Sequence, residues 1–194
     1  MGYSLRAAML VALATWCGVC SAIDCGCSVV VEYYNTTLDH YFLAILPNEI
    51  AAIDEGKAGP GWSRTGETFR SEDYSLYTYG SRVYRFYGSV APGPNSHFFT
   101  MNGAEGQELV HLDRTTPEGV RKWHFERFDF VAGPIGREGC QYPHLYTVPV
   151  FRLYNNGAAR GIDVNHRYTK SSAVVDEMLA KGWIFEGAAF CVIR

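Results

Sequence analysis

Residues 83–100, with the sequence VYRFYGSVAPGPNSHFFT, contain two runs of aromatic and β-branched residues on either side of a segment rich in glycine and proline. Such runs are typical of β-strands, and glycine–proline segments between them are typical of turns. Two other stretches, Glu32-Tyr33-Tyr34-Asn35 and Arg152-Leu153-Tyr154-Asn155, align without gaps on Arg85-Phe86-Tyr87-Gly88. A histidine opens a second run after each of them. This pattern indicates three sequence repeats of one structural unit.

Each unit continues with a segment of helical character, at residues 47–53, 104–110 and 172–181. Each closes with a tryptophan followed seven positions later by a phenylalanine. The constant gap predicts a closing strand of fixed length, whereas the variable gap from tyrosine to histidine predicts a loop that tolerates insertion. The predicted repeat positions are aromatic: Tyr34, Tyr87 and Tyr154; His40, His97 and His166; Trp62, Trp123 and Trp183; Phe69, Phe130 and Phe190.

We expect an α+β fold of three strand–strand–helix–strand repeats, at about residues 29–72, 81–132 and 148–193, with mostly antiparallel strands. One unit cannot bury its aromatic side chains alone, so the three should close around a pseudo-threefold axis and bury them together. A linear solenoid is the alternative arrangement. Three copies and a disulfide near the end of the chain suit a closed domain better.

The first 22 residues have the pattern of a secretory signal: Arg6, an apolar run from Ala7 to Val19, and small residues at the cleavage position. The apolar run is short of the ~20 residues needed to span a bilayer. We therefore expect a signal peptide at 1–22, a single domain at 23–194 without a transmembrane segment, and a secreted or periplasmic location. An N-terminal membrane anchor or a lipid-modified Cys20 is the alternative.

Four cysteines remain after such cleavage, at positions 25, 27, 140 and 191. An even number in an oxidising compartment favours two disulfides. Of the three connectivities, we prefer the one that contains Cys140–Cys191, and the pairing of Cys25 and Cys27 stays open because a bond between them would close a strained ring. Cys-Gly-Cys supplies too few ligands for a zinc site.

The strand from Val83 to Tyr87, the run from His97 to Thr100 and the closing segment from Trp183 to Gly187 resemble the secreted aromatic repeat known as domain of unknown function 5648. The resemblance covers about residues 29–193 in three tandem copies. It implies an extracellular module, found alone or appended to secreted enzymes such as peptidases, without an established catalytic motif. The first copy departs from the pattern, with Glu32 in place of arginine and Thr65 in place of glutamate, so a site that uses these positions should be weaker or absent there.

Two charged pairs are expected within repeats, Arg85 with Glu126 and Arg152 with Glu186, and they would fix the opening strand against the closing strand. The alternative is that these arginines hold an anionic ligand. The three repeated histidines could converge on the axis and hold a metal, but a local structural role for each ring is favoured. We therefore expect no metal and no cofactor.

The net charge of −3, from 17 basic and 20 acidic residues, argues against sequence-independent binding of nucleic acid. No nucleophile elbow, zinc helix or phosphate loop is present in the sequence. We expect a secreted, non-catalytic module that recognises carbohydrate or cell-envelope material, with the tryptophans mainly filling the core. The alternatives are an extracellular hydrolase with a loop-borne site and a purely structural or adhesion protein. The ligand residues should be polar and lie in the loops between strands: Asn95, Ser96, Arg160, Asp163 and Asn165.

Overall fold

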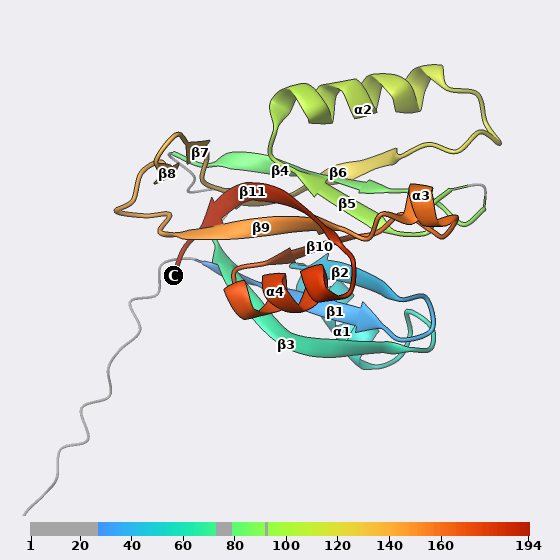
Figure 1. The fold of residues 1–194 in the computed structure, drawn as a ribbon, viewed down its shortest axis with the longest axis horizontal. Coiled ribbons are helices and arrows are strands. Elements are labelled where there is room, and N and C mark those ends of the chain that lie inside the picture. The colour runs from blue at the N-terminus through green and yellow to red at the C-terminus, as the bar shows by residue number, and fades with distance from the viewer. Residues whose placement is uncertain (1–26, 73–78, 92) are drawn as a thin grey trace, which may run out of the picture.

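The computed structural model describes residues 27–72, 79–91 and 93–194 (Figure 1). Most of its strands form three antiparallel sheets of three strands each. The strands are β1 (Ser28–Asn35), β2 (His40–Ala44) and β3 (Trp62–Ser71); β4 (Ser81–Tyr87), β5 (His97–Thr100) and β6 (His124–Ala132); β9 (Val148–Tyr154), β10 (His166–Thr169) and β11 (Ile184–Val192). The sheet orders are β2-β1-β3, β5-β4-β6 and β10-β9-β11, so the first strand is central in every sheet. The fold is α+β with mostly antiparallel strands.

The strand register allows the sheets to be compared position by position. On the second strand of each sheet, one residue faces the central tyrosine: Tyr41 faces Tyr34, His97 faces Tyr87 and His166 faces Tyr154. His40 instead faces Asn35, one position nearer the connecting loop. This corrects the sequence alignment, in which His40 shared a position with His97 and His166. The cause is the short loop after Asn35, whose carboxamide oxygen accepts hydrogen bonds from the backbone of Thr37 and Leu38.

Each closing strand is bulged opposite the middle of its central strand. In the second and third sheets the extra residues are Glu126 and Glu186, which follow the tryptophan by three positions. A bulge turns a side chain away from the direction that regular pleating would give it. Gly187 has a φ of +96°, which explains the glycine after Glu186.

The three closing strands meet at their carboxyl ends. Isolated bridges link Arg70 to Ile193, Glu72 to Val131 and Gly133 to Cys191, so each closing strand contacts both others. Beneath these bridges lie three buried phenylalanines, whose ring centroids are between 5.4 and 6.0 Å apart: Phe69, Phe130 and Phe190. The predicted closing phenylalanines therefore form one core cluster.

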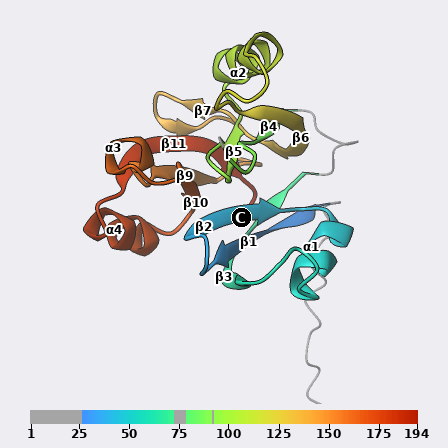
Figure 2. The ribbon, with the colours of Figure 1, turned by 90° about the vertical axis from the view of Figure 1, so that its right-hand side faces the viewer.

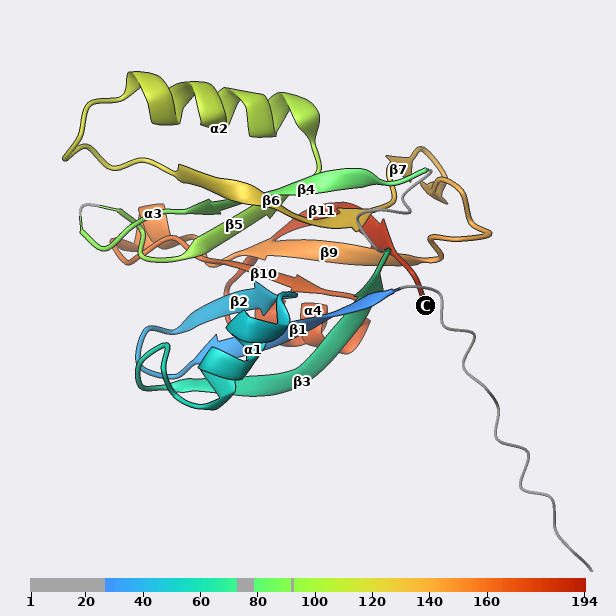
Figure 3. The same cartoon turned by 180° about the vertical axis from the view of Figure 1, so that it is seen from behind.

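A helix follows the second strand of each sheet: α1 (Pro47–Asp54), α2 (Gly103–Thr115) and α4 (Ser172–Ala180). These helices lie outside the sheets, on three sides of the molecule (Figures 2 and 3). The middle segment, which has the weakest helical pattern because of Gly106, forms the longest helix. Asn102 caps it, and Gly106 allows close approach, since a Cβ there would lie 2.7 Å from the ring of Tyr84.

Additional elements lie in the connections, namely the ribbon of β7 (Ile135–Gly136) and β8 (Gly139–Cys140) and the short helix α3 (Gly157–Arg160). The predicted disulfide Cys140–Cys191 is confirmed, and it ties this ribbon to β11. Cys27 is also disulfide-bonded. The predicted signal peptide at 1–22 and Cys25 lie outside the described residues. Of the helices formed by residues 27–72, 79–91 and 93–194, none has the length and apolar character that crossing a membrane requires.

Candidate functional site

The sheets contact one another through three interfaces. We call the contact of the first sheet with the second the first interface, that of the second with the third the second interface, and that of the third with the first the third interface. Each places the second strand of one sheet against the tyrosine-facing residue of the next. The contacts at this level are Phe42 with His97 (ring centroids 4.5 Å apart), Phe98 with His166 (4.8 Å) and the guanidinium of Arg167 with the Tyr41 ring (4.2 Å).

A second set of contacts joins the sheets where the second strands begin. His40 is hydrogen-bonded to the backbone of Asn95, the Ser96 hydroxyl donates to the carbonyl of Val164, and Asn165 Nδ2 donates to the carbonyl of Asp39 at 3.1 Å. The three side chains that make these bonds are almost fully buried. The bonds run from the first sheet to the second, from the second to the third and from the third back to the first, so they close a ring.

The first interface contains a network of charged side chains around Arg85. Its guanidinium lies 3.0 Å from the carboxylate of Glu49 on α1 and 2.6 Å from that of Glu126. Nε2 of His97 lies 3.3 Å from the same Glu126 oxygen. Burial raises the pKa of Glu126, but the hydrogen bonds from His97 and Arg85 outweigh it and hold this pKa at about 2. The Glu126 carboxylate is therefore ionised and held by Arg85 and His97. The contact with Arg85 confirms the predicted pair of Arg85 and Glu126.

The second interface repeats this arrangement around Arg152. Its guanidinium lies 3.0 Å from the carboxylate of Glu105 on α2 and 2.8 Å from that of Glu186, which confirms the second predicted pair. His166 Nε2 lies 3.6 Å from Glu186. Burial and the nearby charge of Arg152 lower the pKa of His166 to about 3, so this ring is neutral near pH 7.

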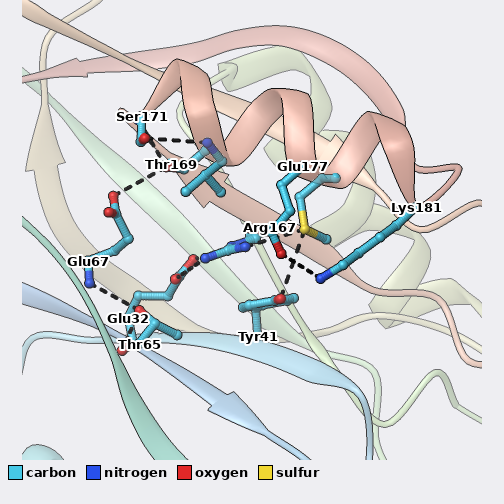
Figure 4. A network of polar contacts seen from close by, with 11 residues as sticks. Glu32, Tyr41, Thr65, Glu67, Arg167, Thr169, Ser171, Glu177 and Lys181 are labelled. Carbon is cyan, nitrogen blue, oxygen red and sulfur yellow. Dashed lines mark hydrogen bonds and ion pairs between the residues drawn. The ribbon is translucent and has the colours of Figure 1, made fainter.

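The third interface departs from the pattern where the sequence does. Glu32 takes the place of the arginine, and Arg167 of the third sheet donates to both of its carboxylate oxygens at 2.9 and 3.1 Å (Figure 4). Burial raises the pKa of Glu32, and the two hydrogen bonds from Arg167 oppose that rise. Thr65 replaces the closing-strand glutamate and donates to the carbonyl of Glu32. The pair of an arginine with a closing-strand glutamate, which the other two interfaces contain, is thus absent from this interface within the described residues.

A pocket of about 290 Å³ lies at the first interface. Its lining combines aromatic rings with a few polar groups, and it comes from β2, α1 and the start of β3 on one side and from the β4–β5 connection on the other. The lining includes Phe42, Trp62, Tyr87, His97, Glu49 and Asn95. A mostly apolar lining with a small number of placed polar groups is typical of small-molecule sites, and this volume is near their lower end of ~300 Å³.

The tryptophans explain why the pocket lies at the first interface. Trp123 contacts His166 across the second interface, with ring centroids 6.5 Å apart. Trp183 contacts Tyr41 across the third, at 5.8 Å and edge to face. Trp62 packs on Phe42 of its own sheet, as Trp123 packs on Phe98, but in the described part of the chain no ring contact links Trp62 with His97. At the second and third interfaces, an indole thus contacts the tyrosine-facing residue of the next sheet. At the first interface, the space between Trp62 and His97 is open.

The structure brings some predicted ligand residues together and leaves others apart. Asn95 and Ser96 line the pocket, and Asn95 Oδ1 accepts a hydrogen bond from the Tyr87 hydroxyl at 2.9 Å. Arg160 and Asp163 are exposed in the loop of the third sheet and do not line this pocket. Asn165 is fully buried; its Nδ2 donates to the carbonyl of Asp39, and its backbone N–H donates to Asn155 Oδ1. Trp183 is buried in the core, as predicted, whereas Trp62 and Trp123 are half-buried.

Sequence reasoning missed Glu49 and Phe42 as site residues. A usable signal for Glu49 was present, because Glu49 and Glu105 are each the third residue of their helices. Across residues 27–72, 79–91 and 93–194, no three histidine, cysteine, aspartate or glutamate side chains are placed so that they could hold a metal ion.

Together, the fold and the pocket define a class of small α+β protein in which antiparallel sheets enclose an aromatic site at one of their interfaces. The family model described as Domain of unknown function (DUF5648) matches residues 19–125, more than half of the chain, and the chain belongs to this family. Every residue that lines the pocket falls within the matched segment. No curated protein and no solved structure matches the chain.

Proposed function

We propose that the protein is an extracellular, non-catalytic binding module and that the pocket of the first interface takes a sugar ring of a glycan or of cell-envelope material. The observation that carries the proposal is the open position between Trp62 and His97, which an indole fills at each of the other two interfaces. A flat ring with apolar faces and a polar rim fits such an opening, and a pyranose has this shape.

The polar groups of the pocket suit the rim of such a ligand. The carboxamide of Asn95 and the hydroxyl of Tyr87 both donate and accept hydrogen bonds, as sugar hydroxyls do. The Glu49 side chain is 23% exposed, and both of its oxygens lie 3.0 Å from Arg85 Nη1, so a ligand can use only their remaining lone pairs. Trp62 and Phe42 supply the apolar surface.

A hydrolase remains the second proposal from the sequence, and the charges near the pocket favour it less. General acid catalysis by a carboxyl group needs a pKa raised toward the working pH. Glu126, the carboxylate behind His97, has its pKa held at about 2 by that histidine and by Arg85. A purely structural or adhesion protein would be expected to self-associate and to bind no glycan.

We further propose that the three sheets are copies of one strand–strand–helix–strand unit closed around a pseudo-threefold axis. Support comes from the common strand order, the mutual contact of Phe69, Phe130 and Phe190, and the closed ring of hydrogen bonds. We also propose that the protein is exported, because residues 1–22 have the pattern of a secretory signal. The disulfide Cys140–Cys191 is in keeping with an oxidising compartment.

The binding proposal is tested by a pull-down on glycan arrays and peptidoglycan, followed by calorimetry with the sugar retained. We expect Trp62→Ala to weaken binding at least tenfold, because it removes the apolar wall of the pocket. Trp123→Ala is the matched control, since this half-buried tryptophan opens the second closing segment and lies outside the pocket. Thermal midpoints of both variants separate unfolding from loss of the site. Absence of any retained glycan, or an equal loss in both folded variants, would refute the assignment.

A further inference from the structure

A second pocket, of about 400 Å³, lies between α2 and the sheet of β4, β5 and β6. Its floor consists of three aromatic rings of β4 and β6, whose centroids are between 4.7 and 5.9 Å apart: Tyr84, Phe125 and Phe128. All three side chains are half-buried, so part of the floor is open to solvent. A volume of this size is within the range of ~300–1,000 Å³ that is typical of small-molecule sites.

The helix side of this pocket is polar, whereas the packed side of a helix is normally apolar. The four residues of α2 that line the pocket are Gln107, Val110, His111 and Arg114. Their spacing, with steps of three and four residues, places them on one stripe of the helix. Three of the four side chains are polar, and this stripe borders an aromatic floor. The arrangement therefore differs from a sealed core, in which both sides would be apolar.

The other two sheets bury a large side chain of their helix at a position where α2 does not. Ile53 and Met178 are each the seventh residue of their helix, and both are buried in a core cluster. The seventh residue of α2 is Leu109, which is only half-buried. The one buried residue of α2 is Gly106. Because α2 contributes no large buried side chain, space remains between this helix and its sheet.

Contacts near both ends of α2 fix its distance from the sheet. Near the start, Gly106 lies against the ring of Tyr84, since a Cβ there would lie 2.7 Å from the ring. Near the end, Asp113 Oδ2 accepts a hydrogen bond from the backbone N–H of Phe125 at 3.0 Å. The other carboxylate oxygen of Asp113 lies 3.0 Å from Nδ1 of His124. The helix is thus anchored on either side of the pocket, which is a part of the folded structure.

The charge of the lining is positive. Arg114 is exposed, and among the described residues it has no hydrogen-bond or ion-pair partner. No carboxylate belongs to the lining. The neighbouring Asp113 is already engaged by the backbone of Phe125 and by His124. An unpaired guanidinium beside an aromatic floor suits a ligand that has a flat apolar body and an anionic group.

We propose that this pocket binds a small aromatic carboxylate, with its ring against the aromatic floor and its carboxylate on Arg114. A guanidinium can donate two parallel hydrogen bonds to a carboxylate, and the carboxamide of Gln107 can donate another. Aromatic pairs gain more than burial of their area alone, which favours an aromatic ring over an aliphatic one. The proposal is independent of the sugar site, because no residue lines both pockets.

The test is a titration of the ¹⁵N-labelled protein with 2-naphthoate at constant ionic strength. Two matched probes are 2-naphthylmethylammonium, which reverses the charge, and decahydro-2-naphthoate, which lacks the aromatic ring. We expect saturable amide shifts at residues 107–114 and at Phe125 with 2-naphthoate. The ammonium probe should give none, and the saturated acid should bind at least threefold more weakly.

Two substitutions at exposed arginines separate the site from general charge effects. Arg114→Gln should weaken the binding of 2-naphthoate about tenfold, because one charge-assisted contact is lost. Arg121→Gln is the matched control, since this arginine is also exposed but lies outside the pocket, and it should leave the affinity unchanged.

A third variant tests the pocket itself. Val110→Trp places an indole in the space between helix and sheet, and we expect it to abolish the shifts while the thermal midpoint stays the same. Lack of saturable shifts with 2-naphthoate, equal binding of either matched probe, or an equal loss in Arg114→Gln and Arg121→Gln would each overturn the proposal. Shifts that persist in folded Val110→Trp would overturn it as well.

Discussion

At the scale of single residues, burial decides which polar groups are structural. Asn35 begins the sequence Asn-Thr-Thr, which has the form of a glycosylation sequon, but its side chain is buried and bonded to the backbone of Thr37, Leu38 and Pro60. Asn165, predicted as a ligand residue from its loop position, is likewise buried, and its Nδ2 donates to the carbonyl of Asp39. Sequence shows that such residues are polar and near a turn, but it does not show which way the turn folds.

His166 leads to a prediction about pH. Its pKa is about 3 in the folded protein and 6.5 for a free side chain. The unfolded chain therefore takes up this proton first, so the stability is complete above pH 6.5 and falls as the pH drops toward 3, by ~1.4 kcal/mol per pH unit for this one group. His166→Tyr, which copies Tyr41 of the first sheet, should flatten the fall of unfolding free energy between pH 6.5 and 4.5.

The measurement is urea unfolding at several pH values. His111→Asn, at an exposed histidine of α2, is the control and should keep the slope of the unaltered protein. If His166→Tyr keeps that slope as well, the buried neutral state assigned to His166 is wrong.

At the scale of strands and helices, the regular spacing in the sequence predicted where the elements lie. It did not predict how they pack against one another. The constant gap from tryptophan to phenylalanine predicted three closing strands, and the structure has β3, β6 and β11 at these places. The helix that contains Gly106 is longer than its sequence indicates, because the sequence shows the cost of a glycine and not the Tyr84 ring that needs its space. The alignment of His40 failed because a short loop fixed the register one position away.

The third interface allows a test of the proposed repeat. Arg167→Phe alone should destabilise the protein by ~3–5 kcal/mol, because it leaves the buried carboxylate of Glu32 without its partner. Adding Glu32→Arg and Thr65→Glu would rebuild the pattern of the other interfaces, an arginine beside a closing-strand glutamate and a phenylalanine. We expect the triple variant to recover more than half of the loss in thermal or urea unfolding. A triple variant no more stable than Arg167→Phe would contradict the repeat.

At the scale of the whole molecule, the sequence predicted the class of fold and the disulfide Cys140–Cys191. It did not predict which of the three interfaces between sheets contains a pocket. Trp62, Trp123 and Trp183 look alike in the sequence, with the same spacing to a phenylalanine. Their difference lies in partners far along the chain: His166 lies across from Trp123, and Tyr41 lies across from Trp183. An open position between sheets depends on such long-range contacts, which is why the pocket could not be located from the sequence.

The three indole groups provide an internal comparison for the sugar proposal. The fourth tryptophan, Trp16, lies in the segment expected to be removed on export. A ¹⁵N titration with the retained sugar follows the indole N–H signals of Trp62, Trp123 and Trp183 in one sample. A saturable shift of the Trp62 signal, with the other two unchanged, is the predicted result. Saturable binding that leaves the Trp62 signal in place, or that moves all three signals equally, would contradict a sugar site at the first interface.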